Sequence, residues 1–141
     1  MPRRSLSVAV ALLLSLALVG LAKADFIPPC VLPEGVVSVP LESVPPALTQ
    51  ALREQFGEIV APGEKFDATD IIIVRKNRRF IFFWNIGKKW IVATEHGGLG
   101  YNDPIFVYQL GEGDRAAVLT KREIAFPNTV CAVASSLLVS P

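Results

Sequence analysis

The stretch TEHGGLGYNDP, residues 94–104, holds the side chains whose types and spacing suit chemistry best in this chain. His96 is the one histidine, and Tyr101 and Asp103 follow it within seven positions. A histidine titrates near neutral pH, so His96 could serve as a general acid or base, oriented by Asp103 and assisted by Tyr101. Glu95 is the poorer partner, because adjacent side chains of a strand point to opposite faces.

A nucleophile for such a reaction is missing. The chain has no serine in a G-x-S-x-G turn, and Thr94 beside His96 is a weak substitute. His96, Asp103 and Tyr101 are therefore candidate catalytic residues only. The enzyme alternative is a small hydrolase or a metal-dependent enzyme centred on His96.

A metal site is less well supported. His96 could be joined by Glu95, Asp103 and Asp70 in a zinc or calcium site only if the fold brought them together. No H-E-x-x-H motif or EF-hand loop occurs, and the glycines of the stretch do not lead into a helix as phosphate loops do. We expect no metal and no cofactor.

Recognition is the better-supported function for this region. Its candidate binding residues combine the polar groups of the loop with nearby large aromatic rings, the side-chain types that dominate protein interfaces: His96, Tyr101, Asn102, Trp84 and Trp90. Phe106 and Tyr108 would add to the same aromatic surface. The structural alternative is that the glycines and Asn102-Asp103-Pro104 only shape a chain reversal.

A second candidate patch is RKNRR, residues 75–79, a cationic turn before an aromatic strand. The simpler interpretation is a solvated segment that keeps the strand soluble.

The N-terminus indicates export. Arg3 and Arg4 precede a long uncharged apolar run that ends in Ala-Lys-Ala before Asp25. This order is typical of a secretory signal peptide, which predicts cleavage after Ala24. The alternative, a membrane anchor, fits less well with the small-residue site and the proline-rich sequence after it. We expect a periplasmic or secreted protein with no membrane span after cleavage.

Removing residues 1–24 leaves 141 − 24 = 117 residues, enough for one domain but too few for two good cores. It also removes three of the 14 basic residues, leaving 14 − 3 = 11 against 13 acidic ones. A mature chain so close to neutral does not indicate nucleic acid as a partner. A partner in the envelope or the extracellular space, or a second copy in a homodimer, remains open.

Cys30 and Cys131 are the two cysteines. In an exported protein such a pair predicts a disulfide, here one that ties together both ends of the mature chain. A redox pair would need the close C-x-x-C spacing, which is absent.

The order of elements predicts an α+β fold. Residues 25–46 contain six of the 11 prolines and should be extended, with VVSV as a short edge strand. One helix should follow Pro46 and end near Gly57, because apolar residues recur at helical spacing between them. Short β-branched and aromatic runs then predict a mostly antiparallel meander of four to six strands over residues 66–126. Residues 47–141 would form one compact domain, with residues 128–139 either strand or helix.

The central hairpin, residues 78–96, carries large apolar groups on both faces of its strands. In the first strand we expect Phe80, Phe82 and Trp84 on one face and Ile81 and Phe83 on the other. Both faces must then be covered, one by the predicted helix and the other by the proline-rich segment, a second copy or a partner. The register depends on whether the turn has two or three residues.

The order of a helix followed by an antiparallel meander resembles, in architecture, cystatin-type and small periplasmic inhibitor domains, although no motif of either is matched. The sequence therefore favours a small exported protein without catalytic activity, a binding or inhibitor-type module. Such a function rests on the candidate site and not on the fold.

Overall fold

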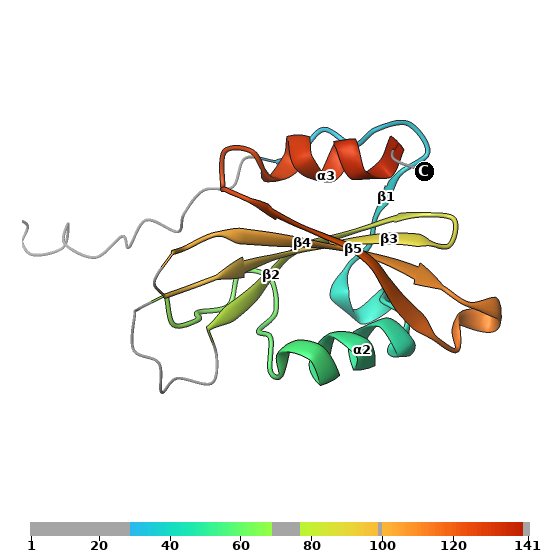
Figure 1. Ribbon diagram of the computed structural model, residues 1–141, viewed down its shortest axis with the longest axis horizontal. Helices are drawn as coiled ribbons and strands as arrows, with labels where there is room; N and C mark the ends of the chain where they lie inside the picture. The colour runs from blue at the N-terminus through green and yellow to red at the C-terminus, as the bar shows by residue number, and fades with distance from the viewer. Residues whose placement is uncertain (1–28, 69–76, 99, 140–141) are drawn as a thin grey trace, which may run out of the picture.

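The computed structural model describes residues 29–68, 77–98 and 100–139. Its centre is a five-stranded antiparallel meander in the order β1-β2-β3-β4-β5, with a helix on each face (Figure 1). The strands are β1 Val37–Ser38, β2 Arg78–Ile86, β3 Lys89–His96, β4 Asp103–Leu110 and β5 Ala117–Ala125. The predicted α+β fold, antiparallel meander and disulfide are confirmed, with a second helix in addition. The predicted signal peptide lies outside the described residues. A further strand was expected at 66–74. Residues 69–74 lie outside the described part of the chain, and residues 66–68 do not form a strand.

The first helix, α2 Pro46–Phe56, has the predicted ends. Pro46 occupies the first turn, where its missing N–H costs no hydrogen bond. Gly57 ends the helix with a positive φ of 74°, and its N–H donates to the Arg53 carbonyl at 2.8 Å. The helix buries Leu48 and Leu52 on the sheet, in a cluster with Phe83, Trp90 and Phe106 among others.

The second helix, α3 Val130–Val139, resolves the open assignment of residues 128–139 as helix. It buries Val130, Ala134 and Leu137, spaced at i, i+4 and i+7, on the sheet face opposite α2. The chain therefore covers the second face itself, with help from Val36 and Cys30 of the proline-rich segment. Neither helix of the described chain has the length and apolar run that a membrane span requires.

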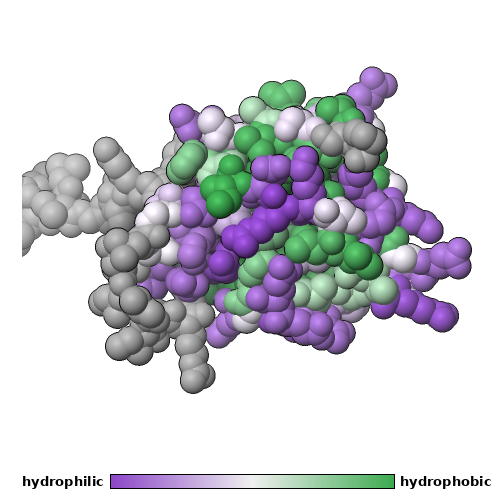
Figure 2. Space-filling view, in the orientation of Figure 1, coloured by the Kyte–Doolittle hydropathy of each residue, from purple (hydrophilic) through white to green (hydrophobic). Residues whose placement is uncertain are grey.

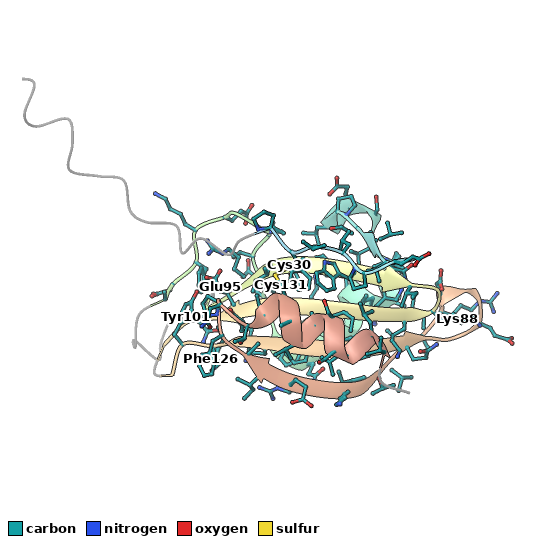
Figure 3. All side chains as sticks on the ribbon, turned by 90° about the horizontal axis from the view of Figure 1, so that it is seen from above. Cys30, Lys88, Glu95, Tyr101, Phe126 and Cys131 are labelled. Atoms are coloured by element: carbon teal, nitrogen blue, oxygen red, sulfur yellow. A yellow bond between two sulfur atoms is a disulfide. The ribbon has the colours of Figure 1, made fainter. Side chains whose placement is uncertain are left out.

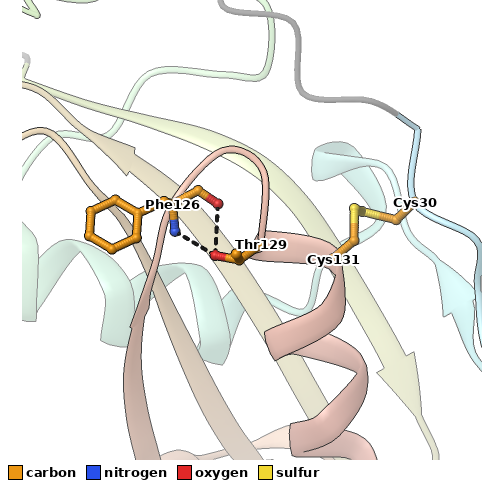
Figure 4. Close-up of a disulfide and its surroundings, with 4 residues drawn as sticks. All are labelled: Cys30, Phe126, Thr129 and Cys131. Carbon is orange, nitrogen blue, oxygen red and sulfur yellow. Dashed lines mark hydrogen bonds between the residues drawn. A yellow bond between two sulfur atoms is a disulfide. The ribbon is translucent and has the colours of Figure 1, made fainter.

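The disulfide joins Cys30 to Cys131 in the first turn of α3 and links residues 101 positions apart (Figure 4). It thereby fastens the segment that leads into β1, at one edge of the sheet, to the helix that follows β5, at the other edge. The cystine packs against the cluster that contains Trp84 and Ala134.

A β-bulge in β2 changes which side chains share a face. The hairpin turn has two residues, since Ile86 pairs with Lys89, and the pairing shifts by one between Phe80 and Phe82. Phe80 therefore lies with Phe83 on the α2 side, their ring centroids 4.7 Å apart. Ile81 and Phe82 pack with Trp84 on the α3 side. The expected grouping of Phe80 with Phe82 was wrong, because one extra residue reverses a strand's faces.

The outer edge of the sheet is β5. Its middle carries Lys121, Arg122 and Glu123, and charged side chains at an edge discourage pairing with another strand. Hydrophilic residues accordingly cross the centre of the face shown in Figure 2, between a hydrophobic area near α3 and another below it.

Candidate functional site

The predicted loop closes between the ends of β3 and β4. Its base is a bridge in which the His96 N–H donates to the Asn102 carbonyl at 2.9 Å and the Asn102 N–H donates back at 3.3 Å. Directly opposed residues share a face, so His96 and Asn102 both lie on the α2 side. Glu95, Tyr101 and Asp103, one position along, belong to the α3 side. Leu99 lies outside the described residues.

Glu95 is the centre of a buried network on the α3 side. Its side chain is 1% exposed, and its carboxylate accepts a hydrogen bond from the Arg79 Nε at 2.7 Å and others from Arg79 Nη2 and the Tyr101 hydroxyl. Arg79 lies opposite Glu95 in the strand pairing and also donates to the Glu64 carbonyl at 3.0 Å. Its guanidinium carbon is 4.6 Å from the Phe66 ring centroid. Such contacts hold the carboxylate in place and leave it little freedom to take part in a reaction.

Figure 3 shows Glu95 and Tyr101 together at one end of the sheet, far from Lys88 in the turn at the other end. Arg79 completes this network from β2, and sequence reasoning did not find it. The signal for it was present in the RKNRR run, but only the bulge in β2 places Arg79 opposite Glu95.

His96 is half-buried on the opposite side of the sheet, with its Nε2 3.4 Å from the side-chain nitrogen of Asn77. Burial lowers the pKa of His96 below its ordinary value, and the positive charges of Arg78 and Arg122 lower it further. A carboxylate partner would instead raise this pKa. The environment of His96 therefore favours the neutral imidazole.

Asp103, the residue expected to orient His96, is fully buried on the other face of the sheet. The structure thus separates the two members of the candidate catalytic pair and places Tyr101 with Glu95. Within the described chain, no three His, Cys, Asp or Glu side chains come together as a metal site would need. Asp70, the other residue considered for a metal, lies outside this part of the chain.

The two tryptophans considered as binding residues are buried in different cores. Trp84 is 2% exposed on the α3 side and Trp90 is 6% exposed on the α2 side. Phe106 and Tyr108 are also buried, and the Tyr108 hydroxyl donates to Gln55 at 2.8 Å. Burial raises the pKa of Tyr108 to about 12. These four rings serve packing in this conformation and do not reach the surface.

Exposed apolar side chains lie instead at the end of β5. Ile124 is 57% exposed and lies opposite Pro104, on the α2 side, and Phe126 is 56% exposed just beyond the strand. Figure 3 places Phe126 at the same end of the sheet as Tyr101 and Glu95. We call His96, Asn102, Ile124 and Phe126 the loop-end surface. Sequence reasoning identified its polar half but missed Ile124 and Phe126, which read simply as strand residues.

Two arginines lie on the same side of the sheet as this surface. Arg78 lies opposite His96, and Arg122 lies opposite Phe106 on the same face. Of the RKNRR run, only Asn77, Arg78 and Arg79 are described. Arg78 and Arg79 are partly buried on opposite faces and do not form a fully solvated patch.

Comparison with known proteins finds no protein family, no curated protein and no solved structure that matches this chain. What the protein does must therefore follow from its own residues.

Proposed function

We propose that this chain is a small exported protein without catalytic activity that binds another exported protein through the loop-end surface. The observation that carries this proposal is that Phe126 is exposed although its backbone is held in place. This residue is more than half exposed, yet its backbone N–H and carbonyl are both bonded to Thr129 (Figure 4).

Phe126 combines exposure with rigidity. Its N–H donates to the Thr129 Oγ1 at 3.0 Å, and its carbonyl accepts from the N–H groups of Thr129 and Val130 at 2.8 and 2.9 Å. Because the backbone that carries the ring is already fixed, less conformational entropy is lost when a partner covers the ring. Burying such a ring contributes roughly 1.5–3 kcal/mol, which is typical of an interface anchor.

The neighbours of Phe126 complete a surface suited to a protein partner. Ile124 adds a second exposed apolar side chain, while His96 and Asn102 supply hydrogen-bonding groups beside it. Interfaces have this composition, an apolar centre with polar groups around it. The role that we prefer for the loop that includes His96 is therefore recognition of a partner protein, which was also the function favoured by the sequence.

The alternative hydrolase finds less support in this geometry. His96 would need a carboxylate on its own face to orient it, but Glu95 and Asp103 belong to the other face and Glu95 is engaged by Arg79 and Tyr101. Export is supported by the Cys30–Cys131 disulfide, since such bonds persist in oxidising compartments.

The test is affinity capture from the exported fraction of the native host with three proteins. They are the wild type, the double variant Ile124→Ser/Phe126→Ser, and the control Val118→Ser. Val118 is a matched control because it is 59% exposed on the same strand but at the other end and on the other face. Circular dichroism must first show that all three are equally folded.

We expect the wild type and Val118→Ser to retain the same protein, and the double variant to lose it. Equal retention by all three proteins would rule out the loop-end surface as the binding site. If none of the three proteins retains another protein, the proposal of a protein partner is contradicted. Light scattering on the purified wild type tests whether a second copy occupies the surface, in which case the double variant alone would be monomeric.

A further inference from the structure

Arg78 and Arg122 lie near His96 of the loop-end surface and on the same face of the sheet. Burial is the main cause that lowers the pKa of Arg78, followed by the positive charge of Arg122, and both arginines act on His96. The ion pairs that join described residues, Arg79–Glu95 and Lys121–Glu123, include neither Arg78 nor Arg122. Within the described residues, two positive charges thus lie close together and neither belongs to an ion pair.

Two phenylalanines in tilted contact hold the arginines in this arrangement. The guanidinium carbon of Arg78 is 5.0 Å from the centroid of the Phe56 ring, and that of Arg122 is 5.6 Å from the centroid of the Phe106 ring. The two ring centroids are themselves 4.4 Å apart. Cation–π contact with adjacent rings therefore orients both guanidinium groups and removes water from one side of each.

Arg78 also has an unused donor. Its Nη1 atom is buried and has no hydrogen-bond partner in the described structure. A buried donor without an acceptor is costly, and a native protein that retains one commonly reserves it for a ligand, water or ion. Repulsion from Arg122 adds to that cost.

We propose that Arg78, Arg122 and His96 bind an oxyanion group with two negative charges. Guanidinium groups pair with oxyanions through two parallel hydrogen bonds, and two of them match a doubly charged group. His96 would add a third donor and a third charge when it is protonated. The inference rests on the proposed function, since it gives the chemical class of what binds beside Ile124 and Phe126: a ligand with an anionic group next to an apolar one.

The test uses the single histidine as a reporter on the whole chain after export. NMR follows the His96 imidazole as pH varies, at constant ionic strength, in chloride, phosphate, sulfate or succinate. The probes are the inorganic anions and the dicarboxylate themselves. Arg78→Met and Arg122→Met each remove one cation, and Arg115→Met is the matched control, because it removes the same charge from the exposed turn between β4 and β5.

We expect phosphate and sulfate to raise the pKa of His96 to its ordinary value of about 6.5 or above in the wild type and Arg115→Met. The same anions should raise Tm by about 4–8 °C at ten times Kd. Arg78→Met and Arg122→Met should abolish both responses. In chloride Arg78→Met should melt no lower than the wild type, because it removes an unsatisfied donor while keeping an apolar contact with Phe56.

A response to succinate and not to phosphate would show that the site binds a pair of carboxylates. Two carboxylates carry the same total charge as one doubly charged oxyanion group. No response to any of the three anions beyond chloride, or a response that survives both arginine variants, would overturn the proposal. Failure here leaves protein capture through Ile124 and Phe126 intact. Conversely, failed capture with a clear anion response would reject the protein partner and retain the anion site.

Discussion

Tyr101 donates its hydroxyl hydrogen to the buried carboxylate of Glu95, six positions earlier in the chain. The contact closes the loop between β3 and β4 from the inside and gives Glu95 a structural role together with Arg79. His96, although adjacent to Glu95, belongs to the other face of the sheet and has a different environment. Some polar residues of the loop thus hold the fold together, and others belong to the loop-end surface.

Removing the cation of the Arg79–Glu95 ion pair should strongly destabilise the fold. Arg79→Met leaves the carboxylate of Glu95 buried without its cation, which we expect to cost about 3–5 kcal/mol in the free energy of unfolding at pH 7. The control is Lys121→Met, whose partner Glu123 is 44% exposed and whose loss should cost less than about 1 kcal/mol. Urea denaturation measures both, and equal costs would contradict a structural role for the pair.

Gly97 and Gly100 are glycines for different reasons, which substitution by alanine should separate. A Cβ atom on Gly97 would lie 2.5 Å from the Ala68 Cα and from the Asp67 carbonyl oxygen, so the backbone itself must move. Gly97→Ala should cost about 3 kcal/mol, the upper end of overpacking costs. Gly100→Ala meets open space and should cost only about 1–2 kcal/mol, from its positive φ of 79°. Thermal melts of the two variants test this order. A larger loss of Tm for Gly100→Ala than for Gly97→Ala would contradict it.

The disulfide should stabilise the fold mainly by restricting the unfolded chain. Its ends are 101 positions apart, for which the loop-entropy relation gives about 4–5 kcal/mol. The double variant Cys30→Ser/Cys131→Ser should lose up to that amount in urea denaturation. Adding a thiol reductant should reproduce the loss in the wild type and leave the double variant unchanged. A wild type insensitive to reductant would show that the bridge contributes little.

His96 should make stability fall as the solution becomes more acidic. Its pKa in the folded state is lowered, so below the usual histidine pKa of about 6.5 the unfolded chain takes up the proton more readily than the folded one. The stability is fully present above that value and is lost as pH falls from 7 toward the folded pKa. His96→Gln should reduce this loss between pH 7 and 5, as measured by urea denaturation at each pH. A parallel pH profile for the two proteins would contradict the lowered pKa.

The sequence predicted those elements whose signals are local. Pro46 and Gly57 mark the two ends of α2, and β-branched and aromatic runs mark β2 to β5. The two cysteines predicted the disulfide because no other pairing within the chain was available. Residues 128–139 lacked such a signal, since small apolar side chains such as Ala132 and Val133 suit a strand as well as a helix.

The candidate site was only partly predictable because it depends on long-range pairing. His96, Asn102 and Tyr101 were found from their types, but their faces follow from the bridge between β3 and β4. Arg78 and Arg79 looked like one charged patch, and only their partners, His96 and Glu95, distinguish them. Trp84 and Trp90 were considered surface residues because residue type does not reveal that α3 and α2 cover them.

The bulge in β2 decides which arginine faces the buried carboxylate of Glu95 and which faces His96. If the pairing set by Ile86 and Lys89 continued unshifted, Arg79 would face His96 and Phe80 would face Glu95. Loss of the bulge at constant chain length, a slip of one residue, would therefore put Arg79 in the place of Arg78 and set an aromatic ring against the carboxylate of Glu95. Substitutions can vary the loop-end surface one side chain at a time, whereas a one-residue slip of this strand would alter the buried ion pair and the surface in one step.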